Sequence, residues 1–225
     1  MGFELIRNIA LFASMDDEDL SNIQTSLRET KIKQGDSLFR KGDEGTSLYI
    51  VKSGTVKIVL PSAEGDEIIV TIFSKGDYFG EMSLVDEEPR SADAIAMEET
   101  ELYVLKRSDF LSFLQSNVEA IKSVLSVLSK RLRRTDELLE DTCFLNISAR
   151  LAKKLTELAE QHGKVDGKTV YVDLVLTQKE LGDTIGATRE SINKELKTLR
   201  EKGLVTTEGN KIRILDMEEL KRRVY

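Results

Sequence analysis

Residues 79–92 set an acidic residue and an arginine nine positions apart, each beside a predicted backbone turn. Gly80 lets the main chain approach a ligand closely, and the carboxylate of Glu81 can accept hydrogen bonds from sugar hydroxyls. The planar guanidinium of Arg90, the Ser91 hydroxyl and nearby backbone amides can bind an anion. Together these groups suit a ribose joined to a phosphate. The alternative is that Glu81 and Arg90 form an ordinary solvated ion pair, a contact that contributes little.

A second stretch with binding potential spans residues 176–203. Thr177 and Glu180 form a capping box at a predicted helix start. Gly186 then lies at a tight turn, and Thr188 can cap the following helix. Two short helices around a glycine turn predict a helix-turn-helix.

The outward face of the second predicted helix carries polar side chains that can read DNA. An N-terminal arginine can donate to guanine, a glutamate can accept from cytosine, and a lysine one turn later can donate to guanine or phosphate. The polar residues of this face are Arg189, Glu190, Asn193, Lys194 and Lys197. Residues 205–215, with a turn at 209–210, predict a β-hairpin wing that would contact the DNA backbone. A charged helix face is often only solvated, but the order Thr-Arg-Glu-Ser after the turn, together with the wing, favours DNA binding.

Residues 79–92 lie in a β-rich region between residues 31 and 106. Its short apolar runs are separated by glycines at predicted turns and cover residues 48–51, 56–60, 67–73, 94–95 and 101–105. Strands at this spacing predict a small antiparallel barrel or jelly roll, which can hold one small ligand. An amphipathic segment over residues 3–27 precedes this region.

A heptad seam follows the β-rich region. Its positions, at alternating steps of four and three, are Ile121, Leu125, Leu128, Leu132, Thr135, Leu139 and Thr142. This spacing predicts a two-stranded coiled coil that serves as a dimer interface, and the alternative is a helix packed on its own barrel. Thr135 is small and polar where leucine is expected. Either a ligand protruding from the barrel reaches the seam there, or a polar layer sets the register.

Residues 143–146 interrupt the heptad pattern and predict a hinge at a domain boundary. Asn146 can cap a new helix that runs from residue 147 to about residue 161. The net charge changes sign at the same place. Residues 1–142 hold 17 lysines and arginines against 27 acidic residues, a net charge of −10, whereas residues 143–225 hold 16 against 13, a net charge of +3. Only the second part could readily approach a polyanion.

The composition excludes several classes of site. A single cysteine, Cys143, excludes an intrachain disulfide and a metal cluster held by several thiolates of one subunit. The single histidine, His162, has no ligand-like neighbours, so neither metal nor haem is expected. No apolar run is long enough to span a bilayer and no signal pattern opens the chain, so no membrane partner and a cytoplasmic location are expected. The sequence shows no histidine cluster, no nucleophile elbow and no set of metal ligands, so an enzyme is not expected.

The order Phe-Gly-Glu-Met-Ser-Leu-Val-Asp-Glu-Glu-Pro-Arg-Ser-Ala over residues 79–92 resembles the phosphate-binding cassette of cyclic-nucleotide-binding domains. With the seam and the winged helix-turn-helix, nearly the whole chain resembles the bacterial cyclic-AMP receptor protein / fumarate–nitrate regulator family of transcription factors. The resemblance implies an α+β fold with an N-terminal antiparallel β jelly roll that binds a cyclic nucleotide (residues 1–116). It further implies a long dimerisation helix (117–142) and a C-terminal winged helix-turn-helix (143–225).

The resemblance also implies partners and a set of site residues. The partners are double-stranded DNA, a second copy of the chain and RNA polymerase, and the effector is a cyclic nucleotide, with cyclic AMP the first candidate. The implied effector site consists of Gly80, Glu81, Met82, Arg90, Ser91, Ala92, Arg131, Thr135 and Asp136. The implied DNA-binding set consists of Thr177, Gln178, Thr188, Arg189, Glu190, Ser191, Lys194 and Lys211.

Within the implied effector site each group has its own role. Glu81 takes the ribose 2′-hydroxyl and Arg90 takes the cyclic phosphate. Arg131 approaches the phosphate and the cassette glutamate, and Thr135 bonds the adenine amino group. A base that contacts both long helices would favour one register of the coiled coil, and the hinge would convert that register into a spacing of the two recognition helices.

Two positions depart from the family's pattern. Lys194 stands where the best-known cyclic-AMP receptors have arginine, which weakens bidentate readout of guanine. Asp136 stands where those receptors have serine or asparagine from the partner subunit. Its carboxylate could accept from an adenine amino group and repel guanine O6, or it could repel the cyclic phosphate. Two rival functions therefore remain: a regulator with another effector or with constitutive DNA binding, and a nucleotide-binding module that acts through protein contacts.

Overall fold

The computed structural model describes residues 6, 7, 9, 11–13 and 15–224. The chain divides into two compact units, Met1–Arg133 and Arg134–Tyr225. The boundary falls inside the long helix α5 (Val118–Phe144), which belongs in part to each unit.

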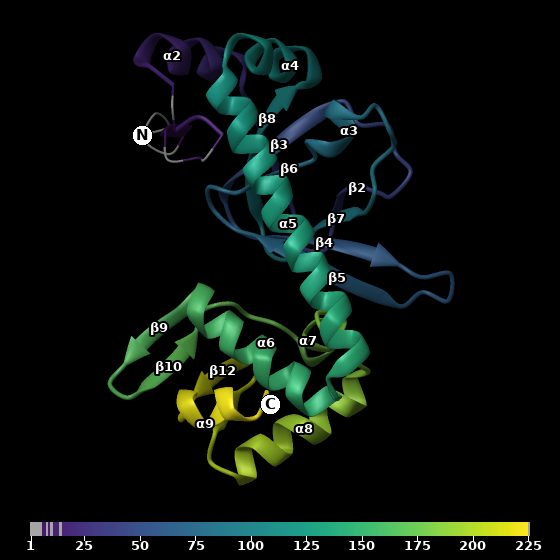
Figure 1. Cartoon of the computed structure of the whole chain (residues 1–225), viewed down its shortest axis with the longest axis vertical. Coiled ribbons are helices and arrows are strands. Elements are labelled where there is room, and N and C mark those ends of the chain that lie inside the picture. Colours follow the sequence, from purple (N-terminus) through teal and green to yellow (C-terminus); the bar gives the residue numbers. More distant parts are fainter. Residues whose placement is uncertain (1–5, 8, 10, 14, 225) are drawn as a thin grey trace. The chain divides into compact units, whose positions relative to one another are not determined.

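In the described residues the first unit contains two antiparallel sheets of four strands each, with strand orders β1-β8-β3-β6 and β2-β7-β4-β5 (Figure 1). The strands are β1 (Arg28–Ile32), β2 (Ser37–Phe39), β3 (Ser47–Ser53), β4 (Val56–Pro61), β5 (Glu67–Phe73), β6 (Tyr78–Phe79), β7 (Asp93–Ala96) and β8 (Thr100–Lys106). In strand β3 the buried residues Leu48 and Ile50 alternate with the more exposed Ser47 and Tyr49, as expected for a strand with one face on the core, and the following Val51 is buried as well. The predicted antiparallel jelly roll is confirmed.

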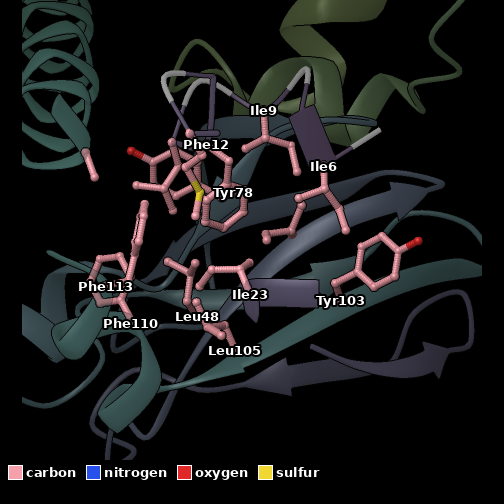
Figure 2. Close-up of a cluster of buried hydrophobic side chains, with 14 of the residues drawn as sticks. Ile6, Ile9, Phe12, Ile23, Leu48, Tyr78, Tyr103, Leu105, Phe110 and Phe113 are labelled. Atoms are coloured by element: carbon pink, nitrogen blue, oxygen red, sulfur yellow. The ribbon is translucent and has the colours of Figure 1, made fainter. Parts of the chain in front are cut away.

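Two apolar clusters stabilise the first unit. The larger cluster joins the sheet of β3 and β8 to the helices α2 (Asp17–Ser26), α4 (Arg107–Ser116) and α5. Figure 2 shows Phe110 and Phe113 of α4 in this cluster, near the paired strand residues Leu48 and Leu105. The smaller cluster packs between the strands and consists of Val51, Val56, Phe73, Phe79, Ala94 and Leu102.

The second unit contains a helix-turn-helix and one four-stranded sheet of order β11-β12-β10-β9. Its helices are α6 (Ile147–His162), α7 (Gln178–Asp183), α8 (Arg189–Glu201) and α9 (Met217–Arg222), and its strands are β9 (Gly163–Asp166), β10 (Thr169–Val172), β11 (Val205–Glu208) and β12 (Lys211–Ile214). The predicted winged helix-turn-helix is confirmed, and the wing is the β11–β12 hairpin. The β9–β10 hairpin and α9, which the sequence pattern did not predict, complete the sheet and pack on α6.

The break between α5 and α6 is shorter than predicted. Cys143 and Phe144 continue α5, so only Leu145 and Asn146 lie outside a helix. The side chain of Asn146 accepts a hydrogen bond from the backbone N–H of Ala149 and caps α6, as predicted. None of the helices described is both long enough and apolar enough to cross a membrane.

Leu105 tests the larger cluster, because its side chain is fully buried there. We expect Leu105→Ala to lower the free energy of unfolding of the first unit by about 2–5 kcal/mol, since it removes buried methyl groups and leaves a cavity. Urea denaturation followed by circular dichroism measures this loss. Leu60→Ala is the control, because Leu60 on β4 is 38% exposed and its truncation should cost less than about 1 kcal/mol. Equal losses in the two variants would contradict this account of the core.

Candidate functional site

A glycine turn and a short helix shape the stretch over residues 79–92. Strand β6 ends at Phe79, Gly80 turns the chain with φ +84°, and the short helix α3 (Met82–Val85) follows. A Cβ atom on Gly80 would lie 2.7 Å from Nη1 of Arg90 and 3.3 Å from the carbonyl oxygen of Ser47. Both the left-handed φ and the close approach of the arginine therefore require glycine. The helix itself was not predicted.

Arg90 is held in one position by backbone and side-chain acceptors. Its Nη1 donates to the Gly80 carbonyl (2.7 Å) and the Ser83 hydroxyl (2.9 Å), and its Nη2 donates to the Ser47 carbonyl (2.7 Å). The residue is only 4% exposed. Burial lowers the pKa of Arg90 from its ordinary value, but an arginine side chain stays charged at neutral pH. The result is a rigid, buried positive charge.

Glu81 is fully buried and pairs with Arg131 of α5, not with Arg90. Oε1 of Glu81 accepts from Nη1 of Arg131, whose Nη2 also donates to the Tyr78 carbonyl (2.5 Å). The solvated Glu81–Arg90 ion pair, the alternative considered from the sequence, is therefore wrong. Arg131 fastens the part of α5 in the first unit to the glycine turn.

Two buried polar atoms of this cluster have no hydrogen-bond partner among the described residues. They are Oε2 of Glu81, an acceptor, and Nε of Arg90, a donor. A buried group left in this state costs about 1–3 kcal/mol, so a folded protein retains it for a reason. A ligand that offers a hydroxyl to the carboxylate and an anionic oxygen to the guanidinium would satisfy both atoms.

Tyr78 supplies a third unsatisfied group. Its hydroxyl has no partner in the described part of the chain, and its ring lies in the larger apolar cluster (Figure 2). Burial, with a smaller effect of the Glu81 charge, raises the pKa of Tyr78 above its ordinary value. The hydroxyl is therefore neutral and can donate a hydrogen bond at physiological pH.

A row of aromatic rings runs between the two arginines. The guanidinium carbon of Arg90 lies 4.3 Å from one end ring, and that of Arg131 lies 4.8 Å from the other. Successive ring centroids are 5.3–5.8 Å apart. The four rings, in order, belong to Phe39, Tyr49, Phe79 and Phe73. The two end rings stack on the two cations and keep them in place. The sequence reasoning did not assign a role to this row.

Gly45 is a further residue to which the sequence reasoning assigned no role. A Cβ atom there would lie 2.1 Å from the Ser83 hydroxyl and 3.5 Å from the guanidinium carbon of Arg90. The loop before β3 can thus press against Arg90 only because residue 45 lacks a side chain. Gly45 has no left-handed φ and lies far from residues 79–92 in sequence, so no local signal identifies it.

The remaining residues of the implied effector site lie at several places. Ser91, directly after Arg90, is exposed, and Ala92 is buried. Met82 is half exposed on α3. Thr135 and Asp136 lie on α5, one turn after Arg131 and past the boundary at residue 133, with both side chains exposed. The first unit therefore brings together Gly80, Glu81, Arg90 and Arg131. In the described residues no group of three or more His, Cys, Asp and Glu side chains could hold a metal ion.

The helix-turn-helix has the predicted caps. The Thr177 hydroxyl accepts from the Glu180 N–H (3.1 Å), and the Glu180 carboxylate accepts from the Thr177 N–H (3.0 Å). The Thr188 side chain caps α8 by accepting from the Ser191 N–H. Gly186 has the left-handed φ of +62° that the turn needs. Gly182, which the sequence reasoning did not single out, leaves no room for a Cβ, because the Ala187 carbonyl oxygen would lie 2.4 Å away.

Helix α8 buries one face and exposes the other. Its buried residues are Ile192, Leu196 and Leu199, as predicted. The predicted reading residues Arg189, Glu190 and Lys194 are all exposed. Ser191 and Gln178 are half-buried, and Lys211 is exposed at the start of β12. Nη1 of Arg200 donates to the Thr207 hydroxyl (3.1 Å), which ties α8 to the wing.

Two family models match successive parts of the chain. Residues 29–117 match the cyclic nucleotide-binding domain, and residues 149–223 match the Crp-like helix-turn-helix domain. The first match covers the sheets and the buried Glu81–Arg90 cluster, and the second covers the helix-turn-helix and the wing.

Curated proteins and solved structures give the same result. The chain is 33% identical over 220 residues to the CRP-like cAMP-activated global transcriptional regulator of Mycobacterium tuberculosis, covering 98% of both chains. It is 32% identical over 196 residues to the cyclic AMP receptor protein of Thermus thermophilus, covering 87% of both. A solved CRP-family transcriptional regulator, also from Thermus thermophilus, superposes with a TM-score of 0.73 at 26% identity, covering 87% of this chain and 96% of that one. The chain therefore belongs to the cyclic-AMP receptor protein / fumarate–nitrate regulator family of transcription regulators.

Proposed function

We propose that the chain is a homodimeric transcription regulator whose DNA binding is controlled by a cyclic nucleotide, cyclic AMP in the first place. One observation supports this most directly: Oε2 of Glu81 and Nε of Arg90 are buried without a partner among the described residues. A cyclic nucleotide carries a ribose hydroxyl next to an anionic phosphate. Its 2′-hydroxyl would donate to Glu81, and its phosphate would accept from Arg90 and Ser91.

The choice of cyclic AMP rests on the relatives and on Asp136. The Mycobacterium tuberculosis relative is described as cAMP-activated. Thr135 and Asp136 offer acceptors to an adenine amino group, and a carboxylate would repel the O6 of guanine. Cyclic AMP is therefore the effector that we propose over cyclic GMP.

Helix α5 has two apolar faces, and one of them supports homodimerisation. Ala120, Val124 and Leu128 pack on the first unit's own apolar cluster, so the alternative of a helix packed on its own domain holds for this face. Leu125, Leu132 and Leu139 are spaced by seven residues and are 58%, 63% and 64% exposed. Such a regular exposed apolar stripe is typical of a coiled-coil seam that a second copy covers.

The regulatory mechanism follows from the position of α5. Arg131 links this helix to Glu81, and the same helix carries Thr135 and the seam. An effector that binds one arrangement of the paired helices better than another would shift the equilibrium toward it, with a typical coupling of about 1–3 kcal/mol. The arrangement favoured by the effector would place the two α8 helices in successive major grooves. RNA polymerase is the proposed further partner, and the cytoplasm, where bacterial DNA lies, is the proposed location.

Glu81→Gln tests the effector site, because it keeps the shape of the side chain but removes the charged acceptor. We expect the affinity for cyclic AMP, measured by isothermal titration calorimetry, to fall by about 10- to 100-fold, as for the loss of a hydrogen bond to a charged group. Glu88→Gln is the matched control in the same loop, where the side chain is exposed, and should leave the affinity unchanged. If wild-type protein binds no cyclic AMP, or if Glu81→Gln binds it equally well, the proposed site is wrong.

Arg189→Ala and Lys211→Ala separate base reading from backbone contact. Arg189 lies at the exposed start of α8, so its loss should weaken binding to a preferred duplex by about 5- to 150-fold and change binding to random duplex little. Lys211→Ala in the wing should weaken both and reduce the salt dependence by about one unit of slope. Mobility-shift titrations over a range of salt concentrations measure both effects. Two variants with identical profiles would argue against a reading role for Arg189.

Leu132→Glu tests the dimer seam. A charge in the middle of the exposed stripe should convert the dimer to a monomer, because a carboxylate is costly to bury between two helices. Sedimentation equilibrium measures the mass. Val165→Glu is the control, since Val165 on β9 is even more exposed but lies off the seam. A Leu132→Glu protein that stays dimeric would show that another surface makes the dimer.

A further inference from the structure

An ion pair crosses the short break between α5 and α6 within the second unit. Nζ of Lys153, on α6, lies 2.7 Å from the carboxylate of Asp141, in the last turn of α5. Both side chains are partly buried. Burial by itself would lower the pKa of Lys153, but the hydrogen bond and the charge of Asp141 raise it overall. The pair therefore stays charged, and it bridges the two residues, Leu145 and Asn146, that separate the helices.

One turn away on α6, Arg150 reaches the turn of the helix-turn-helix. Its Nη1 donates to the carbonyl of Ile185 at 2.6 Å. Ile185 precedes Gly186, whose left-handed φ directs the chain into α8. Nε of Arg150 is buried without a partner in the described residues, so packing rather than a second hydrogen bond fixes this part of the side chain.

Arg150 and Lys153 are three positions apart on one helix and are therefore neighbours on the same face. The apolar face of α6 differs from this one and includes the buried residues Leu151, Leu155 and Leu158. That apolar face supplies the packing that stabilises the unit. A partly exposed ion pair and a single hydrogen bond add little to the stability of the unit. Their contribution is to fix the positions of the elements that they contact, α5 and the turn before α8.

We propose that Asp141, Lys153 and Arg150 are positioning residues that together hold the start of the recognition helix α8 in a fixed relation to the last turn of α5. This set, which we name the α6 clamp, connects α6 to two non-helical joints. One is the two-residue break, and the other is the glycine turn. None of the three side chains needs to touch DNA. Loss of the clamp should therefore reduce the discrimination between sequences more than the overall attraction to DNA.

The test compares sequence discrimination in matched variants of the full chain. The probes are a duplex enriched by the wild-type protein from a random pool and a random-sequence duplex of equal length. Lys153→Met and Arg150→Met keep the apolar stem of each side chain and remove the clamp contact. Lys154→Met is the control, because Lys154 pairs with Glu157 of the same helix and reaches neither α5 nor the turn. Each variant loses one positive charge, which affects both probes equally, so the affinity ratio cancels this effect.

We expect Lys153→Met and Arg150→Met to lower the ratio of the two affinities by about tenfold or more, the effect of misreading about one base pair, while Lys154→Met stays within about twofold of wild type. Thermal unfolding should be similar in all of them. Asp141→Lys should lower the ratio as well, and the exchanged pair Asp141→Lys with Lys153→Asp should restore it. Unchanged ratios in the clamp variants, or no recovery on exchange, would overturn the proposal.

This inference rests on the proposed function of the chain as a DNA-binding regulator. The same titrations with and without cyclic AMP separate the clamp proposal from the effector proposal. If cyclic AMP changes neither affinity of the wild-type protein, the proposed effector is wrong, while the ratio measured without nucleotide still decides the clamp. If wild type responds to cyclic AMP and the clamp variants keep full discrimination, the clamp proposal fails and the effector proposal stands.

Discussion

The burial of charge at the glycine turn is the constraint on which the first unit depends. Arg90 and Glu81 are both removed from water, and such groups are tolerated only when partners replace the solvent. Backbone carbonyls and the Ser83 hydroxyl surround Arg90, and Arg131 neutralises Glu81. Gly45 and Gly80 are required because their missing side chains leave the space for this arrangement. The partners present do not satisfy every atom: Oε2 of Glu81 and Nε of Arg90 remain without a partner among the described residues, and these are the atoms that the proposed effector would satisfy.

Because Arg131 belongs to α5, its ion pair with Glu81 also connects the glycine turn to that helix. One face of α5 is committed to the apolar cluster of its own unit, through Ala120 and Val124. The exposed leucines lie on another face, and Arg131 lies directly before Leu132. A change at the Glu81 carboxylate is thus one residue away from the seam. In the proposed dimer, no chain of distant contacts would therefore be needed to couple the effector site to the second copy of the chain.

Local sequence signals predicted most of the elements and fewer of the contacts. The turn glycines, the heptad spacing and the Thr177–Glu180 capping box each depend on residues within a few positions, and the corresponding elements formed as expected. Strand β1 was missed because its Arg28–Ile32 segment is largely exposed and polar, and α3 was missed because four residues carry no period. The aromatic row, Gly45 and the α6 clamp are contacts between segments far apart in sequence. A pattern along one chain contains no signal for them.

The two units use opposite means to keep polar groups in place, and this difference follows from what each must bind. In the first unit Glu81 and Arg90 are buried, so each of their hydrogen bonds is strong and each unsatisfied polar atom is costly, which suits a single small ligand with a fixed pattern of donors and acceptors. In the second unit the α8 side chains that we propose to read DNA are exposed and long, and their positions depend on the backbone that carries them. DNA readout requires that backbone to be placed to within a fraction of a base step. The buried apolar face of α8 supplies part of this placement, and hydrogen bonds close to its two ends, from Arg150 to the turn and from Arg200 to the wing, add to it.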